Sequence, residues 1–164
     1  MKNEMELIFD AIAENEAFAR VAVSAFAANM NPTLEELADI KTAVSEAVTN
    51  AIIHGYGNVR GYQGRNMIAD LKTPDRPGKV RLACAIRDGV LDVIVEDKGF
   101  GIENVEKAME PLYTTKPELD RSGMGFAFME AFMDDLEVNS TPGQGTRIHM
   151  RKKLEAGSWI VGED

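Results

Sequence analysis

The sequence contains a single cysteine and has little positive charge. Cys84 has no second cysteine among the 164 residues with which to form a disulfide, and we therefore expect a reducing, cytoplasmic compartment. Eighteen lysines and arginines stand against 27 aspartates and glutamates, which gives a net charge of -9. Binding to nucleic acid or to an anionic membrane surface needs clustered basic residues. The composition thus argues against direct contact with either.

Long hydrophobic runs are also missing. No stretch of the sequence is apolar over the roughly 20 residues that a membrane-spanning helix needs. Acidic residues interrupt positions 1–18, so this segment does not resemble a secretory signal peptide. The hydrophobic content of 45% is typical of a soluble globular protein. We predict one domain over residues 1–154, followed by a C-terminal tail over 155–164.

Two helices are predicted in the first third of the chain. The helix over 14–30 leaves Glu16 and Arg20 outward, one turn apart, and its apolar stripe is predicted to face inward. The inward residues are Phe18, Val21, Ala22, Ala25 and Phe26. Thr33 and Glu36 have the spacing of a capping box, which predicts that a second helix starts there and runs to Gly55.

Alternating apolar residues predict strands in the remainder of the chain. Residues 80–86 and 90–96 form a hairpin through Asp88-Gly89, and further strands are expected over 6–12, from 138, and over 146–152. Short helices are expected over 103–109 and 125–136. The glycine- and proline-rich segment 57–78 is predicted to be a loop insertion. This order predicts an α+β fold, a two-layer sandwich with helices on one face of a mostly antiparallel mixed sheet.

The second predicted helix places Glu46 and Asn50 one turn apart on its polar face. This spacing is common on solvated helix surfaces, so the pair has no functional meaning unless other motifs accompany it.

One accompanying motif follows the strand over 90–96. In Asp97-Lys98-Gly99-Phe100-Gly101, the two glycines permit positive φ angles and a close approach of a ligand. An ionised carboxylate only accepts hydrogen bonds, so Asp97 is suited to an exocyclic amine such as that of adenine. The alternative interpretation is a turn that ends a strand.

A second glycine motif, Ser122-Gly123-Met124-Gly125, opens the predicted helix over 125–136. Free backbone N–H groups at a helix start bind phosphate oxygens. The sequence has neither Gly-x-Gly-x-x-Gly nor a P-loop, which excludes those two nucleotide-binding classes. On the preceding loop, Thr114, Thr115 and Lys116 offer hydroxyl groups and an ammonium to a phosphate tail, unless this is a plain surface loop.

Two remaining features are weaker. Gly145-Thr146 at the start of the last strand is too short to interpret alone. His54 and His149 lack a second ligand at metal-binding spacing, and we interpret both as structural.

Taken in order, Glu46-x-x-x-Asn50, Asp97-x-Gly99-x-Gly101, Gly123-x-Gly125 and Gly145-Thr146 resemble the Bergerat-type ATP-binding family of gyrase, Hsp90-type chaperones, histidine kinases and MutL. Residues 45–56, 114–119, 121–126 and 132–135 are similar to the anti-sigma F factors of endospore-forming bacteria. The resemblance covers nearly the whole chain except the tail. Segment 57–78 is longer than the connection expected in that family, and Tyr113 stands where phenylalanine is expected.

The resemblance implies an ATP-dependent protein serine kinase that sequesters a sigma factor of the sigma F kind and forms a homodimer. The phosphoacceptor serine would belong to a separate anti-anti-sigma factor. Glu46 would accept the proton of that serine hydroxyl, and Asn50 would bind Mg²⁺. The ATP-binding residues that it implies are Asn50, Asp97, Gly99, Gly101, Thr114, Thr115, Lys116, Gly123, Met124, Gly125 and Thr146.

A surface outside the ATP site must then contact both protein partners. Arginine is enriched in the energetic hot spots of interfaces, so we predict that Arg20, with Glu16, belongs to this surface. The alternative is an ordinary exposed ion pair.

Other functions stay open. A histidine kinase is the nearest rival, although no pair of helices with an acceptor histidine precedes the ATP motifs. A related stress-response anti-sigma serine kinase and a non-catalytic, ATP-dependent binding module are the others.

Overall fold

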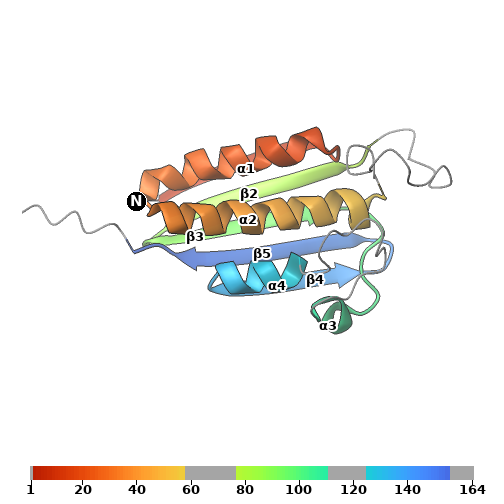
Figure 1. Ribbon diagram of the computed structural model, residues 1–164. Helices are drawn as coiled ribbons and strands as arrows, with labels where there is room; N and C mark the ends of the chain where they lie inside the picture. The colour runs from red at the N-terminus through yellow and green to blue at the C-terminus, as the bar shows by residue number, and fades with distance from the viewer. Residues whose placement is uncertain (1, 58–76, 111–124, 156–164) are drawn as a thin grey trace, which may run out of the picture.

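Five strands form one sheet in the order β1-β2-β3-β5-β4, and the helices cover one of its faces (Figure 1). The computed structural model describes residues 2–57, 77–110 and 125–155. The strands are β1 (Lys2–Asp10), β2 (Lys79–Arg87), β3 (Val90–Asp97), β4 (Asp135–Thr141) and β5 (Gly145–Lys153). The predicted α+β sandwich is confirmed. Every pairing between these five strands is antiparallel, so the sheet is not mixed.

The long helices lie together on the covered face of the sheet, and the short helix α3 (Val105–Ala108) lies apart from them, next to β4. The other helical elements are α1 (Glu14–Ala27), the 3₁₀ turn η1 (Ala28–Met30), α2 (Leu34–Asn50), the π-helical turn η2 (Ala51–Gly55) and α4 (Gly125–Phe132). In Figure 1, α2 lies between α1 and α4 and runs toward the end of the sheet at which β3 finishes. The helix that carries Glu46 and Asn50 is therefore the central element of its layer.

The capping box predicted at the start of α2 is present. The Thr33 hydroxyl accepts the Glu36 N–H at 3.1 Å, and the Glu36 carboxylate accepts the Thr33 N–H at 2.7 Å. The helix buries Val44, Ala47 and Val48 against the sheet, as its periodicity predicts. After Asn50 the backbone widens into η2, and such π-helical turns are frequent at functional sites.

The hairpin of β2 and β3 forms the centre of the sheet. Asp88 and Gly89 have φ angles of 51° and 78°, as a two-residue turn of type I′ requires. Alternate residues of both strands are buried under the helices, among them Cys84. Burial raises the pKa of the Cys84 thiol to about 12, so it stays protonated at neutral pH.

The other face of the sheet carries ion pairs across the strands. Arg81 on β2 contacts Glu6 on β1 at 2.8 Å and Glu96 on β3 at 3.0 Å, and Arg147 on β5 contacts Glu96 at 3.2 Å. All four side chains are partly exposed, where such pairs contribute little to stability. Lysine and arginine thus alternate with acidic residues on the uncovered face.

Three predicted boundaries are wrong. β1 covers Lys2–Asp10 instead of 6–12, because it pairs with β2 along the whole of that strand. α4 ends at Phe132 instead of 136, and β4 begins at Asp135 instead of 138. The Asp134 N–H donates to the Arg151 carbonyl at 2.8 Å, so pairing with β5 replaces the helix at this point.

The predicted inward stripe of α1 is also partly wrong. Phe18 and Val21 are 52% and 63% exposed, whereas Ala19, Val23 and Phe26 are buried. Alanine is so frequent in this helix that two apolar stripes, offset by one residue, both have helical spacing. Packing against α2 and the sheet decides which of the two stripes is buried. The Phe18 ring contacts Phe9 edge to face, with centroids 6.4 Å apart. α1 therefore presents apolar side chains at the surface.

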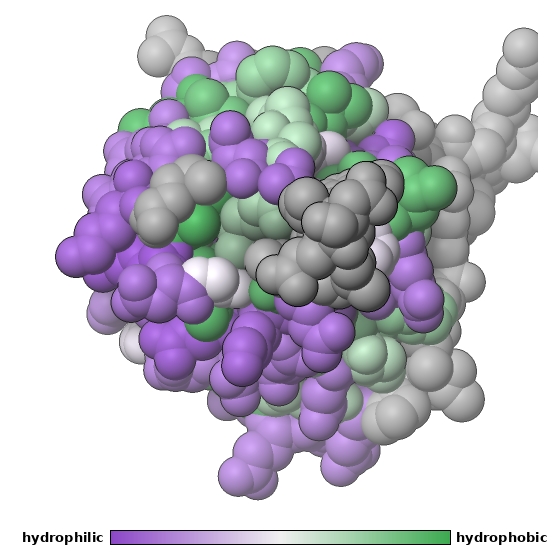
Figure 2. Space-filling model, turned by 90° about the vertical axis from the view of Figure 1, so that its left-hand side faces the viewer, coloured by the Kyte–Doolittle hydropathy of each residue, from purple (hydrophilic) through white to green (hydrophobic). Residues whose placement is uncertain are grey.

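Figure 2 shows the end of the molecule at which α2 begins, and its surface in this view is mostly hydrophilic, with smaller hydrophobic areas among the polar ones. Leu34, the first residue of α2, is 88% exposed.

Within residues 2–57, 77–110 and 125–155, no helix is both long and apolar enough to span a bilayer. Most of the predicted insertion over 57–78 lies outside the described residues, and so does the predicted loop that carries Thr114, Thr115 and Lys116.

Candidate nucleotide-binding site

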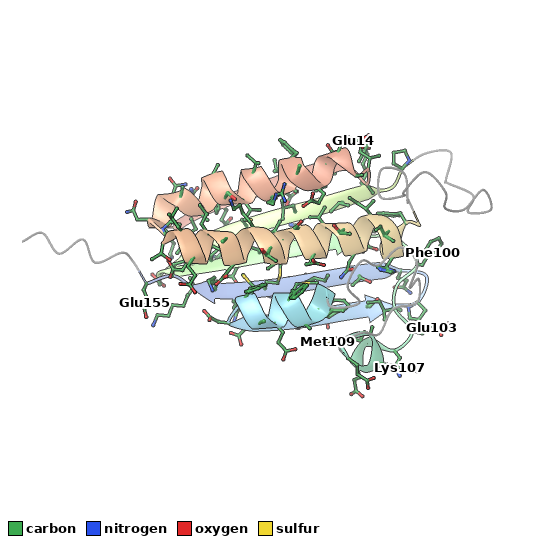
Figure 3. All side chains as sticks on the ribbon, viewed as in Figure 1. Glu14, Phe100, Glu103, Lys107, Met109 and Glu155 are labelled. Atoms are coloured by element: carbon green, nitrogen blue, oxygen red, sulfur yellow. The ribbon has the colours of Figure 1, made fainter. Side chains whose placement is uncertain are left out.

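A cavity of about 380 Å³ lies at the end of the sheet where β3 and α2 finish. Figure 3 shows Phe100, Glu103 and Lys107 at this end, and Glu155 at the opposite end. The end of β3, η2, α3, the start of α4 and the start of β5 all contribute to its lining. The volume lies in the range of about 300–1,000 Å³ that is typical of small-molecule sites.

Asp97 is the last residue of β3 and lines this cavity. Its side chain is only 8% exposed, and its Oδ1 accepts the Gly99 N–H at 2.9 Å. Burial raises the pKa of the Asp97 carboxyl to about 6, while hydrogen bonds from the backbone of Gly99 and Thr146 act in the opposite direction. A carboxylate held in an apolar environment with few donors is suited to bind a donor from a ligand.

The glycines around Asp97 are required by backbone contacts. The Phe100 N–H donates to the Gly55 carbonyl at 2.8 Å, and a Cβ on Gly99 would lie 1.8 Å from that same oxygen. A Cβ on Gly55 would lie 2.8 Å from the Asp97 carboxyl carbon. Gly101 has a φ angle of 73°. The Asp-x-Gly-x-Gly motif is therefore needed to bring η2, β3 and the following turn together, and it shapes this wall of the cavity.

Thr146 lies beside Asp97, because the two residues are register partners in β3 and β5. Thr146 lines the cavity and is 9% exposed. Its hydroxyl lies 2.8 Å from the Ser140 hydroxyl on β4, which also accepts the Ile102 N–H at 2.7 Å. Three separate segments thus meet behind Asp97 and Thr146.

Glu46 and Asn50 share one face of α2, and this face packs against the start of α4. A Cβ on Gly125 would lie 3.2 Å from Glu46 Oε2 and 3.4 Å from Asn50 Nδ2. Both side chains are half-buried, and Asn50 lines the cavity. Their amphipathic helix therefore places a carboxylate and a carboxamide at the junction of α2, α4 and the cavity. Among the described residues, no group of three or more His, Cys, Asp and Glu side chains is arranged to hold a metal ion.

The charge of the cavity lining is negative in the part of the chain that the structure describes. Asp97, Glu103 and Glu110 contribute carboxylates, and Lys107 contributes an ammonium group. A polyphosphate at this site would need further positive charge or N–H donors. The predicted ligands Thr114, Thr115, Lys116, Gly123 and Met124 lie outside the described residues, and their roles stay predictions.

Sequence reasoning missed several residues that build the site. The Tyr56 hydroxyl donates to the Lys79 carbonyl at 2.6 Å and accepts the Lys98 N–H at 2.7 Å, which anchors the turn after Asp97. Ser140 supports Thr146, and His54 lines the cavity. The signal for Tyr56 was its place after His54-Gly55 at a helix end. Ser140 gave no comparable signal, because nothing in a single strand indicates which loop it contacts.

The two residues predicted for partner binding lie on α1, away from the cavity lining. Arg20 Nη1 is 3.8 Å from Glu16 Oε1, and its side chain is 42% exposed. Glu16 is not outward as predicted: its side chain is 16% exposed and accepts a hydrogen bond from the Ser45 hydroxyl on α2. The partner-binding role of both residues stays a prediction.

Comparison with known proteins gives the class of this domain and then its family. The model of the histidine kinase-like ATPase domain matches residues 9–152. Among solved structures, the RsbU and RsbW domains of a protein from Mycobacterium tuberculosis superpose with a TM-score of 0.60 over 93% of this chain and 32% of that one. Their sequence identity is 21%, so this likeness shows the fold alone.

Curated relatives give a narrower group. Anti-sigma F factor of Clostridium acetobutylicum is 53% identical over 94% of this chain and 96% of its own length. The protein of the same name from Pasteuria penetrans is 52% identical over 94% and 93%, and one from Clostridium perfringens is 54% identical over 94% and 99%. The chain therefore belongs to the anti-sigma F factor family, within the histidine kinase-like ATPases.

Proposed function

We propose that this protein is an ATP-dependent protein serine kinase that also sequesters a sigma factor in the cytoplasm. One observation carries the proposal: a cavity with a buried acceptor pair at Asp97 and Thr146 also reaches the face of α2 on which Glu46 and Asn50 meet the start of α4. The end at Asp97 and Thr146 suits the adenine ring of a nucleotide, and the end at Glu46 and Asn50 suits phosphoryl transfer.

Adenine fits the Asp97 end of the cavity. Asp97 Oδ1 accepts the Gly99 N–H, and the carboxylate has further lone pairs for an exocyclic amine. The glycines leave the wall next to it without side chains. Asn50 is suited to hold Mg²⁺ through its amide oxygen, because this hard ion takes few protein ligands and keeps its phosphate and water ligands. When bound, the ion neutralises charge on the transferring phosphoryl group.

Glu46 is proposed as the general base. A protein kinase needs a carboxylate near the acceptor hydroxyl, and Glu46 lies one helical turn from the proposed magnesium ligand. Lys116 and the backbone around Gly123 are proposed to bind the phosphate tail. They would supply the positive charge and the N–H donors that the negatively charged lining of the described residues lacks.

The protein partners are proposed from the family. The relatives are named anti-sigma F factors, so we propose a sigma factor of the sigma F kind as the sequestered partner. A serine on an anti-anti-sigma factor is the proposed phosphoacceptor, and a homodimer is the proposed assembly. The exposed Phe18, Val21 and Arg20 on α1 support a protein-binding surface outside the cavity.

The test combines phosphate labelling with binding. The purified protein is mixed with labelled Mg-ATP and the anti-anti-sigma factor, and the product is washed in acid. Phosphoserine survives this treatment and phosphohistidine does not, so label retained on the partner supports the proposal, and label lost in acid supports a histidine kinase.

Two further readouts separate the remaining alternatives. A non-catalytic ATP-binding module binds the partners but forms no ADP when the anti-anti-sigma factor is added. Competition between sigma factors for the protein under Mg-ATP separates a sporulation anti-sigma factor from a stress-response relative, because each binds its own sigma factor more tightly.

A further inference from the structure

The Ser140 hydroxyl has three hydrogen-bond partners, and its capacity is fully used. It donates its only hydrogen to the Gly145 carbonyl at 3.0 Å. It accepts the Ile102 N–H at 2.7 Å, and it lies 2.8 Å from the Thr146 hydroxyl. A serine hydroxyl has one donor and two acceptor positions. All three contacts are hydrogen bonds at once only when the Ser140 hydrogen goes to the carbonyl, which only accepts, and Thr146 is the donor in the contact between the two hydroxyls.

The arrangement that satisfies all three contacts sets the direction of the Thr146 hydroxyl. Its hydrogen points to Ser140, so its free lone pairs are the only hydrogen-bonding capacity that it has left. Thr146 lines the cavity next to Asp97, its register partner, whose ionised carboxylate also only accepts. The buried end of the cavity thus presents two neighbouring acceptors and no hydroxyl donor from Thr146.

We propose that Ser140 is a specificity-determining positioning residue, which holds Thr146 as an acceptor and so selects 6-amino purines over 6-oxo purines. The proposal rests on the proposed function, because it names how that ATP site recognises its base. The amine of adenine has two N–H donors, and a 6-oxo group has none. A 6-oxo oxygen directed at two acceptors finds no donor, and a buried polar atom without a partner is costly.

The local structure supports a fixed rather than a rotating hydroxyl pair. Thr146 is 9% exposed, and Ser140 is half-buried on β4. Gly145 has a φ angle of 96° and packs closely against Asp97: a Cβ on Gly145 would lie 2.0 Å from the Asp97 carbonyl oxygen. This close packing holds the Gly145 carbonyl in place. The Ile102 N–H belongs to the turn that follows Gly101. Both anchors of the Ser140 hydroxyl are therefore backbone groups: Ile102 lines the cavity, and Gly145 precedes the lining residue Thr146.

The test measures the dissociation constants of ATP and of inosine triphosphate by titration calorimetry. The base of inosine triphosphate has a 6-oxo group and an N1–H in place of the 6-amino group and the N1 lone pair of adenine. In Ser140→Ala the Thr146 hydroxyl is released and can donate to a 6-oxo group. We expect the preference for ATP to fall by about tenfold, the value of about one hydrogen bond, and we expect inosine triphosphate to bind more tightly in absolute terms. Ser140→Thr, which keeps the hydroxyl, should keep the wild-type preference.

A structural effect of the substitution gives a different result. If Ser140→Ala only loosens the cavity, both nucleotides lose affinity together and their ratio stays at the wild-type value, which would overturn the proposal. Ser140→Cys gives the same readout if the alanine variant does not fold, because a thiol is a weak hydrogen-bonding group of similar shape. In a Thr146→Val background, adding Ser140→Ala should leave the ratio unchanged, and a further change there would also overturn the proposal.

Failure of the proposed function looks different again. A wild-type protein that binds neither nucleotide contradicts the ATP site itself. A wild-type protein that binds ATP with a clear preference, while Ser140→Ala leaves this preference intact, contradicts the role of Ser140 alone.

Discussion

The two ends of the cavity are built in different ways. At the end that is proposed to bind adenine, Asp97 and Thr146 are 8% and 9% exposed and are held by hydrogen bonds from several segments. At the other end, Glu46 and Asn50 are half-buried side chains of one helix, and their positions depend on how α4 packs against α2. A rigid, buried end suits affinity and selectivity, whereas a more open end suits a reaction with a second protein.

This difference predicts that substitutions at the two ends change different quantities. A change at Asp97 or Thr146 should alter nucleotide affinity and the stability of the fold, since it alters a buried hydrogen-bond network. A change at Glu46 should alter the rate of transfer, since a general base acts mainly in the transition state.

The largest effect is expected for Glu46→Gln. It removes the proposed general base but keeps the shape of the side chain. Serine phosphorylation should therefore fall about 100- to 10,000-fold, while Mg-ATP affinity stays close to wild type. The measurement is the initial rate of acid-stable label transfer, together with calorimetric titration of ATP. Glu35→Gln is the matched control, because it makes the same change at an exposed position of the same helix. Near-normal transfer by Glu46→Gln would remove Glu46 from the reaction.

The pH dependence of stability should show the cost of burying Asp97. The folded state raises the pKa of this carboxyl from 3.8 to about 6, so between these values the folded protein holds the proton more tightly than the unfolded chain. This contribution therefore decreases stability as the pH rises through the window, and Asp97→Asn should gain about 2 to 3 kcal/mol relative to wild type between about pH 4 and pH 7. Denaturant unfolding of the nucleotide-free protein at several pH values measures it.

Asp92→Asn on the same strand provides a control of opposite sign. The pKa of Asp92 is lowered, against the effect of its burial, by hydrogen bonds from Arg151 and His149. Its stabilising contribution is present above the unfolded pKa and is lost as the pH falls, so this variant should lose stability relative to wild type as the pH rises. A difference between Asp97→Asn and wild type that does not vary with pH would contradict the burial cost.

Nucleotide affinity should depend on the same carboxylate. In Asp97→Asn, an amide that also carries donors replaces an acceptor, and we expect ATP binding to weaken by about 1 to 3 kcal/mol. Calorimetry at neutral pH measures the loss. Asp92→Asn, on the uncovered face of β3, should bind ATP as the wild type does. Equal ATP affinity in Asp97→Asn and wild type would show that the adenine ring does not bind at Asp97.

The smallest effect is expected outside the cavity. Arg20→Glu should weaken partner binding by more than about 1.4 kcal/mol, a tenfold change, with ATP affinity close to wild type. It also places an acidic residue one turn from Glu16, which should cost the fold only a few tenths of a kcal/mol. Surface binding assays with each partner measure the change, and Glu130→Lys at an exposed position of α4 is the charge-reversal control. A loss of ATP binding in Arg20→Glu would indicate damage to the fold instead.

Much of the fold was predictable because its signals are local. The capping box of Thr33 and Glu36, the turn at Asp88-Gly89 and the alternation in β2 each lie within a few residues of one another. The end of α4 was mispredicted, because the hydrogen bond that replaces the helix there is accepted by the Arg151 carbonyl on β5. The exposure of Phe18 was missed for a similar reason: the choice between two apolar stripes depends on packing with other elements.

The site divides in the same way. Asp97 and its glycines, and the pair of Glu46 and Asn50, were identified from short motifs that lie within one turn or one loop. Ser140 and Tyr56 were missed, because each acts through a backbone group far away in the sequence, at Ile102 and at Lys98. Contacts between distant segments are what a single sequence does not reveal.

The most direct test of the division between the two ends is a steady-state measurement with the anti-anti-sigma factor as acceptor. The kcat and the KM for ATP are determined for wild type, Glu46→Gln and Asp97→Asn. We expect Glu46→Gln to lower kcat with little change in KM, and Asp97→Asn to raise KM with a much smaller change in kcat. If both substitutions change the same parameter to a similar extent, the two ends of the cavity do not have separate roles.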